Sequence, residues 1–474
     1  MGSGIPARRL ATLVGTVSSP AFSGLASALA RLIADGRLPL AAKLPSEREL
    51  AGALGLSRTT ITRAYSALVE AGYAVARQGA GTFTQVPGGI RRGRDHGLLP
   101  RPSGADLIDL TCAACDAVPG LASAYAEAAA ELPAYLRGHG YFPLGVPDLR
   151  AAIAADYAAR GAPTEPEQIL VTSGTIGAIA AVAAALVGTG DRVLVESPAY
   201  PNSVTAFRRA GGRLVSAAVD PSGWDLDDLT ATLRQAHPKL AYLIPDFQNP
   251  TGLLMSDDQR AAVAAELAAT RTIGMVDECH YALRLDDAPA PLAFAAHSPG
   301  TISVGGASKL FWGGLRIGWI RAPRPLLTRL TQARLGLDLG APLLEQLVVA
   351  RLLTDTDAAG QQRDRLRANR DLLAGLLGDL LPDWRFRLPS GGLSLWVELT
   401  RPAAAALAVE AERRGLVITP GSVFSPDGGL SSFVRLPYIL GADELTRVAH
   451  ILAESWAALD DLAGTPDPVR ILIA

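Results

Sequence analysis

Apolar residues recur every three or four positions in the first part of the chain, which predicts a small helical unit. One such stripe covers residues 24–35. In the segment that follows, Ser46 and Glu49 have the spacing of a capping box and predict the start of a helix, while Gly55 predicts its end. Residues 1–56 are therefore expected to contain at least two helices.

A further helix and a pair of strands follow. Ser57 can cap a helix over residues 57–71, and Arg58, Thr59, Thr62 and Arg63 cluster on one face near its start. The apolar stripe on the opposite side consists of Ile61, Ala64, Tyr65 and Leu68. Residues 72–85 have the composition of two short strands around a glycine-bearing tip. The pattern over residues 1–85 thus predicts helix-turn-helix followed by a wing.

Periodicity is lost at residues 86–105, which contain five glycines and three prolines and read as a flexible basic linker. Beyond it, residues 106–474 alternate between apolar β-type runs and alanine-rich helical segments. The runs are residues 169–172, 193–196, 240–244, 273–277 and 301–305. Such alternation predicts an α/β fold with a large, mostly parallel sheet and a smaller C-terminal α+β domain, whose ligands bind at the carboxyl ends of the strands.

Charge divides the chain in the same way as the pattern does. Of 44 basic and 46 acidic residues, 12 basic and 4 acidic ones lie in residues 1–94. The remaining 32 basic and 42 acidic residues make the rest of the chain acidic. A basic head on an acidic body indicates that only the head meets a polyanion. Without a signal-peptide pattern or a run of about 18 apolar residues, we expect a cytoplasmic protein that does not enter membranes.

The head closely resembles the GntR-type winged helix-turn-helix. That resemblance implies contacts with double-stranded operator DNA, made through the N-terminal end of the helix over residues 57–71 and through the wing. The positions implied are Arg48, Ser57, Arg58, Thr59, Thr62, Arg63, Gln78 and Gly79.

Lysine is scarce in this chain, which makes Lys309 conspicuous. Three lysines stand beside 41 arginines, and Lys309 follows a β-type run and precedes Arg316 by seven residues. An amine whose pKa shifts can attack an aldehyde, whereas a guanidinium cannot. The pair therefore predicts a lysine that forms a Schiff base and an arginine that holds a phosphate.

Other motifs fall at the expected strand ends. Residues 172–178 can present backbone N–H groups and a helix N-terminus to an anion. Asp277 closes an apolar strand and needs a partner there. Residues 246–252 read D-F-Q-N-P-T-G and residues 432–436 read S-F-V-R-L.

Together these motifs resemble, in order and spacing, the pyridoxal-phosphate enzymes of the aspartate aminotransferase fold. The resemblance implies covalent attachment of the cofactor to Lys309, a ring-nitrogen partner in Asp277 and a bidentate site for a substrate carboxylate in Arg435. It also implies a dimer, because Tyr141 would reach the phosphate of the neighbouring subunit. The further cofactor-binding positions implied are Asn249, Tyr200, Gly174, Thr175, Ile176, Ser308, Arg316 and His280.

Three positions depart from that family's pattern. His280 stands where relatives usually have a tyrosine, although Tyr281 follows directly. Ile176 and Gly306 each replace a polar residue of the phosphate site. These departures bear on transamination and on substrate choice, but they leave Lys309 and Asp277 intact.

Cys112 and Cys115 form a C-x-x-C pair without a second pair, so no metal site is predicted. Two small loop residues, or a redox pair, are the alternatives for them.

The order of a GntR-type head, a linker and an aminotransferase-like body resembles the MocR family of transcription regulators. It implies a head-to-tail, domain-swapped homodimer that senses pyridoxal phosphate, an amine or an amino acid through an external aldimine. The alternatives are an active aminotransferase with an accessory DNA-binding domain, and a regulator whose body no longer holds the cofactor. The favoured interpretation is a sensor that is not an enzyme, with at most a residual half-reaction.

Overall fold

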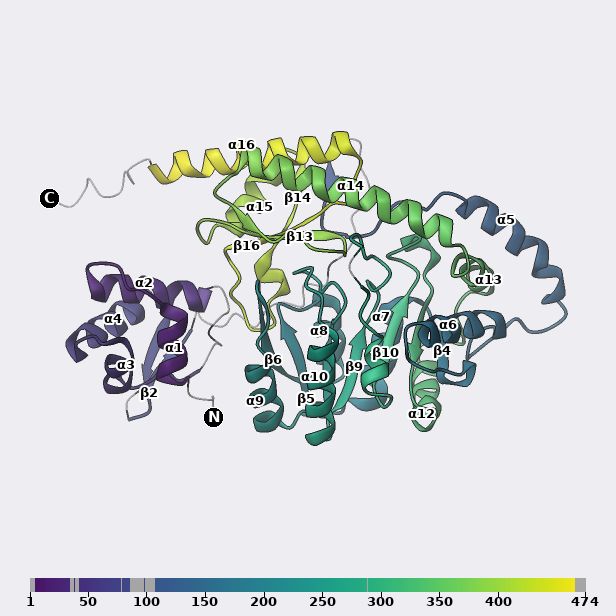
Figure 1. Cartoon of the computed structure of the whole chain (residues 1–474), viewed down its shortest axis with the longest axis horizontal. Coiled ribbons are helices and arrows are strands. Elements are labelled where there is room, and N and C mark those ends of the chain that lie inside the picture. Colours follow the sequence, from purple (N-terminus) through teal and green to yellow (C-terminus); the bar gives the residue numbers. More distant parts are fainter. Residues whose placement is uncertain are drawn as a thin grey trace.

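The computed structural model describes residues 5–34, 38, 42–77, 79–85, 98, 107–287 and 289–464. A helical N-terminal unit is followed by a large domain on an eight-stranded sheet and by a small C-terminal domain (Figure 1). The expected linker at residues 86–105 lies outside the described residues except for Leu98. Its boundaries therefore stay a prediction. In the part of the chain that the structure describes, no helix is long and apolar enough to cross a membrane.

The N-terminal unit has the order expected of a winged helix-turn-helix. Its elements are α1 (Ala7–Val14), α2 (Ala21–Ala34), α3 (Glu47–Leu54), α4 (Arg58–Glu70), β1 (Ala74–Arg77) and β2 (Gly81–Thr84). Ser46 and Glu49 form the capping box of α3, and Gly55 ends that helix in the left-handed region. The stripe predicted on α4 is buried in the core of this unit. β1 and β2 pair antiparallel as the wing.

The large domain is organised around one mixed sheet. Its strands in spatial order are β4 (Ile169–Thr172), β11 (Gly318–Arg321), β10 (Ile302–Gly306), β9 (Ile273–Asp277), β8 (Leu240–Leu243), β5 (Arg192–Ser197), β6 (Arg213–Asp220) and β7 (Gly223–Trp224). The strands from β10 to β6 are parallel, whereas β11 and β7 run antiparallel to their neighbours. The predicted fold class, with its mostly parallel sheet, is confirmed.

Helices cover both faces of this sheet, and further helices of the large domain pack on those helices. They are α5 (Leu121–Glu131), α6 (Pro147–Ala159), α7 (Gly174–Leu186), α8 (Pro201–Arg209), α9 (Leu226–Ala236), α10 (Asp257–Ala269), α11 (Phe294–His297), α12 (Arg324–Leu335) and α13 (Leu343–Leu352). Side chains of α7 and α12 share one apolar core with the sheet, and side chains of α9 and α10 share another. With both faces covered, the central strands are mostly apolar.

The small domain packs a four-stranded antiparallel sheet against long helices. The sheet has the order β12 (Arg385–Phe386), β13 (Ser394–Glu398), β16 (Phe433–Pro437) and β15 (Thr419–Pro420). The helices are α14 (Thr356–Leu380), α15 (Ala404–Arg413) and α16 (Ala442–Gly464); α14 and α16 lie side by side above the body in Figure 1. A short strand, β3 (Ile108–Asp109), pairs with β14 (Leu416–Val417). The segment at the start of the body is thereby held against the small domain.

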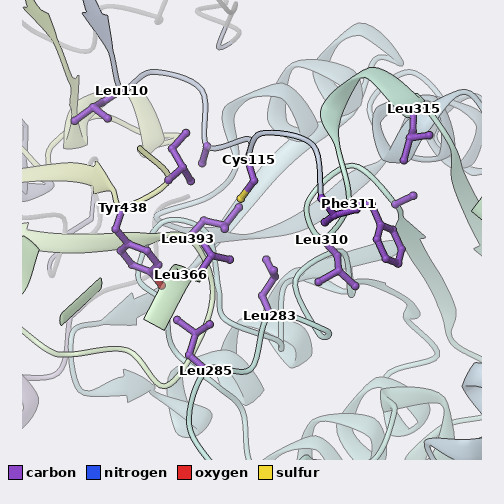
Figure 2. Close-up of a cluster of buried hydrophobic side chains, with 14 of the residues drawn as sticks. Leu110, Cys115, Leu283, Leu285, Leu310, Phe311, Leu315, Leu366, Leu393 and Tyr438 are labelled. Atoms are coloured by element: carbon purple, nitrogen blue, oxygen red, sulfur yellow. The ribbon is translucent and has the colours of Figure 1, made fainter. Parts of the chain in front are cut away.

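One apolar cluster joins the two domains of the body beside Lys309 (Figure 2). Leu310 and Phe311 contribute from the turn after β10, and Leu366 contributes from α14. Leu110 and Cys115 contribute from the segment at the start of the body. Because protein cores are close-packed, this cluster fixes the turn that carries Lys309.

Candidate functional site

Lys309 lies in the turn after β10, at the carboxyl end of the parallel strands. Its Nζ donates a hydrogen bond to the backbone oxygen of Ala113, 2.7 Å away. Residues 302–306 form β10 because they are small or β-branched and are covered on both faces. The strand and the apolar cluster beside it place a half-buried amine at the edge where we expected the site.

Asp277 ends β9, the strand beside β10, and is buried. Tyr242 Oη donates to its Oδ2 at 2.8 Å, and the Cys279 amide donates to its Oδ1 at 3.0 Å. Burial raises the pKa of Asp277, and these hydrogen bonds and the nearby Lys309 act in the opposite direction. A carboxylate held in this way can pair with a protonated ring nitrogen.

The turn between β4 and α7 is built to approach an anion. Gly174 has φ +80°, and Arg316 Nη2 donates to the Ser173 carbonyl at 3.3 Å. A Cβ atom placed on Gly174 would lie 2.6 Å from Arg316 Nη2, so only glycine leaves the guanidinium in place. The backbone N–H groups at the start of α7 and the guanidinium of Arg316 therefore lie at the same turn, where both kinds of donor could meet one anion.

Two further glycines allow this turn to pack closely against β10 and β11. A Cβ on Gly318 of β11 would lie 2.6 Å from the backbone nitrogen of Thr175. A Cβ on Gly306 of β10 would overlap the hydroxyl of Thr175, which donates to the Gly305 carbonyl at 3.3 Å. The departure at Gly306 thus has a steric reason, because Thr175 occupies the space of a serine side chain. Ile176 packs against the apolar core of the large domain.

Arg435 lies on β16 of the small domain and is almost wholly buried. It donates to the Thr111 carbonyl at 2.6 Å and to Asn249 Oδ1 at 3.3 Å, and its guanidinium lies over the ring of Phe424. Burial lowers the pKa of Arg435 to about 10, which leaves it charged at neutral pH. A buried cation with a free donor suits a carboxylate ligand.

Tyr200 connects these groups. It precedes α8 and lies close enough to Asp277 and Arg435 for both charges to act on its phenol, although burial is the main reason that its pKa is raised. The structure thus brings together the side chains predicted to hold the cofactor ring and a ligand carboxylate, and Thr175 of the predicted phosphate turn contacts the end of β10, which precedes Lys309. His280 belongs to the same group, since Lys309 and Arg435 both act on its pKa.

Tyr141 lies apart from this group and is 56 % exposed. The structure contains one chain, so the predicted contact of Tyr141 with the neighbouring subunit stays a prediction. Leu339 is similarly exposed, and the adjacent Gly340 packs against the backbone of Phe142. Two exposed apolar side chains therefore lie on neighbouring segments.

Sequence reasoning missed the segment at residues 111–115. Its carbonyl groups accept hydrogen bonds from Lys309 and Arg435, and no side-chain pattern announces such a role. Cys112 and Cys115 are both free, and burial raises the pKa of Cys115 to about 11. Tyr242 was missed as well. Its signal was a phenol in the middle of an otherwise apolar strand, where a buried hydroxyl needs a partner.

The helix predicted to read DNA has its N-terminal end open. Ser57 caps α4 through a hydrogen bond from the Thr60 amide, and the Arg58 side chain is 75 % exposed. Arg63 is exposed as well, and its guanidinium lies 3.8 Å from the ring centre of Phe22. The predicted positions that are exposed besides Arg58 are Arg48, Ser57, Thr59, Thr62, Arg63 and, at the wing turn, Gly79. Gln78 lies outside the described residues.

The side chains fit pyridoxal phosphate and a carboxylate ligand. Three of the buried polar atoms without a hydrogen-bond partner among the described residues belong to these residues: Ser308 Oγ, His280 Nε2 and Arg435 Nε. Buried polar groups are almost always satisfied in folded proteins, so unpaired ones around a single site indicate a ligand. The turn beside Arg316 adds backbone N–H groups at a helix N-terminus and a guanidinium, which are the donors that a phosphate requires.

Known proteins resemble the chain in two separate regions. Residues 118–452 match the family described as aminotransferase class I and II, and residues 23–84 match the family described as bacterial regulatory proteins, gntR family. The structure of LysN, the α-aminoadipate aminotransferase of Thermus thermophilus, superposes with a TM-score of 0.69 at 28 % identity. It covers 76 % of this chain and 94 % of that one.

Two regulators resemble this chain over different extents. The HTH-type transcriptional regulator YdfD of Bacillus subtilis is 26 % identical over 88 % of this chain and 92 % of its own length. The probable rhizopine catabolism regulatory protein MocR of Rhizobium meliloti is 31 % identical over 61 % of this chain and 63 % of its own length. The similarity to YdfD thus extends over the head and the body together.

Proposed function

The chain belongs to the aminotransferase class I and II family and joins to it a gntR-type DNA-binding domain, and we propose that its body controls the head by sensing an amine or amino acid. This combination makes it a transcription regulator of the MocR type, with a body of a pyridoxal-phosphate-dependent fold. The observation that carries the sensing proposal is the buried Arg435 guanidinium, which has a free Nε donor beside the Lys309 site.

Each side chain has one task in this proposal. Lys309 binds the cofactor covalently, Asp277 keeps a proton on its ring nitrogen, and Gly174, Thr175 and Arg316 hold its phosphate. When bound, pyridoxal phosphate supplies an electrophilic carbon that captures amines. Arg435 then orients a ligand by its carboxylate. Burial of Asp277 and Arg435 excludes water, which strengthens both charge pairings.

The head would bind operator DNA through the N-terminal end of α4. Arg58 is exposed there and forms an ion pair with Glu47 at 3.3 Å, which an encounter with DNA can replace. Arg58→Ala should lower affinity for a specific operator by about 1–3 kcal/mol if the side chain reads a base. Equal losses on operator and random DNA, measured by fluorescence anisotropy, would assign Arg58 to the phosphate backbone instead.

The body would act as a cytoplasmic dimer with its partner beside Tyr141. The exposed Tyr141 and Leu339, which lie on neighbouring segments, support such a contact. Large exposed apolar side chains on adjacent segments are typical of interfaces. In a head-to-tail dimer two heads would meet two half-sites, and sedimentation at micromolar concentration measures the assembly directly.

The experiment for the sensing proposal begins with Lys309. Borohydride reduction of protein loaded with pyridoxal phosphate should place the added mass on the peptide that contains Lys309, and Lys309→Ala should abolish it. A label on Lys239, which pairs with Asp191 at 2.6 Å, would contradict the assignment.

Arg435→Ala then tests sensing. It should leave cofactor loading and ligand-free DNA binding near the wild-type values and remove the response of DNA binding to amino acids. Coupling between two sites is typically about 1–3 kcal/mol, so wild-type operator affinity should change by roughly 5- to 150-fold on saturation. A full response in Arg435→Ala would rule out a carboxylate ligand at this residue.

An active aminotransferase is the second candidate, because Lys309 and Asp277 are both in place. Steady-state turnover between an amino acid and a keto acid, measured on purified protein, separates an enzyme from a sensor. Turnover that continues unchanged on addition of operator DNA would favour the enzyme.

A further inference from the structure

Among the described residues His280 makes one hydrogen bond, and that bond determines which ring nitrogen carries the hydrogen. The side chain is 5 % exposed, and its Nδ1 lies 3.0 Å from the backbone oxygen of Phe247. A carbonyl oxygen can only accept, so the hydrogen is on Nδ1. A neutral imidazole has one such hydrogen, which leaves a lone pair on Nε2.

The Nε2 atom is buried and has no partner among the described residues. The ring stays neutral, because burial lowers the pKa of His280 to about 4 and the Lys309 and Arg435 charges add to this effect. Leaving a buried acceptor unpaired costs free energy, about as much as a lost hydrogen bond. His280 lies beside the Lys309 and Arg435 site, because it follows Asp277 by three residues and contacts Phe247, two residues before the Asn249 that binds Arg435.

We propose that His280 Nε2 accepts a hydrogen bond from the ligand at this site, and so selects an occupant that presents an O–H or N–H donor there. The inference rests on the proposed function, because it concerns the same cofactor and effector site. His280 would then determine specificity as a hydrogen-bond acceptor, the opposite of the donor role that a tyrosine hydroxyl can take. A tyrosine hydroxyl at this position can donate to an oxygen, whereas His280 in this tautomer cannot.

The donor can come from either of two groups, the ring hydroxyl of pyridoxal phosphate or an N–H group of an amino-acid effector. An acceptor at Nε2 stabilises the protonated form of the group that faces it, just as a donor stabilises the ionised form. If the ring hydroxyl of the cofactor is the donor, the loaded protein should therefore absorb more in the near ultraviolet and less in the visible than a variant with a hydrogen-bond donor at position 280.

Two variants and a matched control test the proposal. His280→Gln retains an oxygen acceptor of similar reach, and His280→Phe keeps a ring but removes the acceptor. His297→Gln is the control, since His297 pairs with Asp257 at 2.9 Å, away from Lys309. Pyridoxal phosphate affinity should fall roughly 3- to 10-fold in His280→Phe, the range of one hydrogen bond, and change less in His280→Gln. If the effector is the source, the loss appears only in the affinity for L-alanine added to loaded protein.

Nitrogen-15 NMR of histidine-labelled protein reads the tautomer directly. Without ligand, the His280 signals should show a protonated Nδ1 and an unprotonated Nε2. A shift of the Nε2 signal with pyridoxal phosphate alone assigns the donor to the cofactor, and a shift only after L-alanine is added assigns it to the amino acid. Either result supports the proposal.

A protonated Nε2, or an Nε2 signal unmoved by both additions, overturns it. The proposal is also overturned if His280→Phe binds both pyridoxal phosphate and L-alanine with the wild-type affinity. Borohydride trapping on Lys309 in the same samples separates the two levels: failure to trap refutes the proposed cofactor site, whereas normal trapping with an unmoved Nε2 refutes only the role of His280.

Discussion

At the scale of single residues, burial of ionisable groups makes stability depend on pH. His280 has an ordinary pKa of 6.5 in the unfolded chain and of about 4 in the folded one. Between these values the unfolded state binds more protons, so this residue costs stability as the pH falls from 7 toward 4. Between pH 7 and pH 5 the loss should be about 2 kcal/mol, and His280→Gln should not show it. Urea unfolding of both proteins at the two pH values measures the difference. Glu196 acts with the opposite sign, because burial raises its pKa to about 7, so the wild-type curve by itself would hide the effect. Equal pH dependence in the two proteins would mean that His280 is not neutral in the folded state.

At the scale of elements, glycines on β10 and β11 let the turn before α7 approach the sheet. Gly318→Ala would put a Cβ atom 2.6 Å from the Thr175 backbone nitrogen, and a backbone cannot swing aside as a side chain can. We expect the turn to shift, pyridoxal phosphate affinity to fall at least about tenfold, and stability to fall by about 1–3 kcal/mol through overpacking. Gly300→Ala is the matched control, since nothing lies within 4 Å of its Cβ position. Cofactor titration and thermal unfolding of both variants test this, and equal affinities would show that the turn does not hold the phosphate.

At the scale of the whole molecule, the head contacts the body through α1. Arg9 pairs with Asp228 at 2.7 Å and with Asp225 at 3.3 Å, both at the start of α9. These groups are partly exposed, so the contact should contribute only about 0.5–1 kcal/mol and weaken with salt. Arg9→Ala should therefore leave unfolding of the body unchanged while freeing the head, which increases the radius of gyration in small-angle scattering at low salt. Arg8→Ala, on the adjacent exposed residue, is the control. The same pairs could form between two subunits in a domain-swapped dimer, and mixing Arg9→Ala with an Asp228→Asn chain would then restore one of two contacts. An unchanged radius in Arg9→Ala would show that other contacts hold the head.

Much of the architecture follows from the sequence because it depends on local rules. The capping box at Ser46, the end of the helix at Gly55 and the buried stripe of α4 are set by residues three or four positions apart. The alternation of strands and helices indicated the parallel sheet, and the order of the motifs placed Lys309 and Asp277 at its carboxyl edge. The composition also shows that lysine is scarce, and this scarcity singled out Lys309.

The tertiary structure decided what depends on contacts between distant segments. No local pattern shows that residues 111–115 supply acceptors to both Lys309 and Arg435, or that Tyr242 donates to Asp277. The steric need for Gly306 appears only when Thr175 is packed against it, and the tautomer of His280 appears only when the Phe247 carbonyl faces it. The sequence by itself determined which elements form and which chemistry they carry, since both follow from side chains near in the chain. Partners, tautomers and close approaches were decided by packing, because they arise between residues that meet only in the folded molecule.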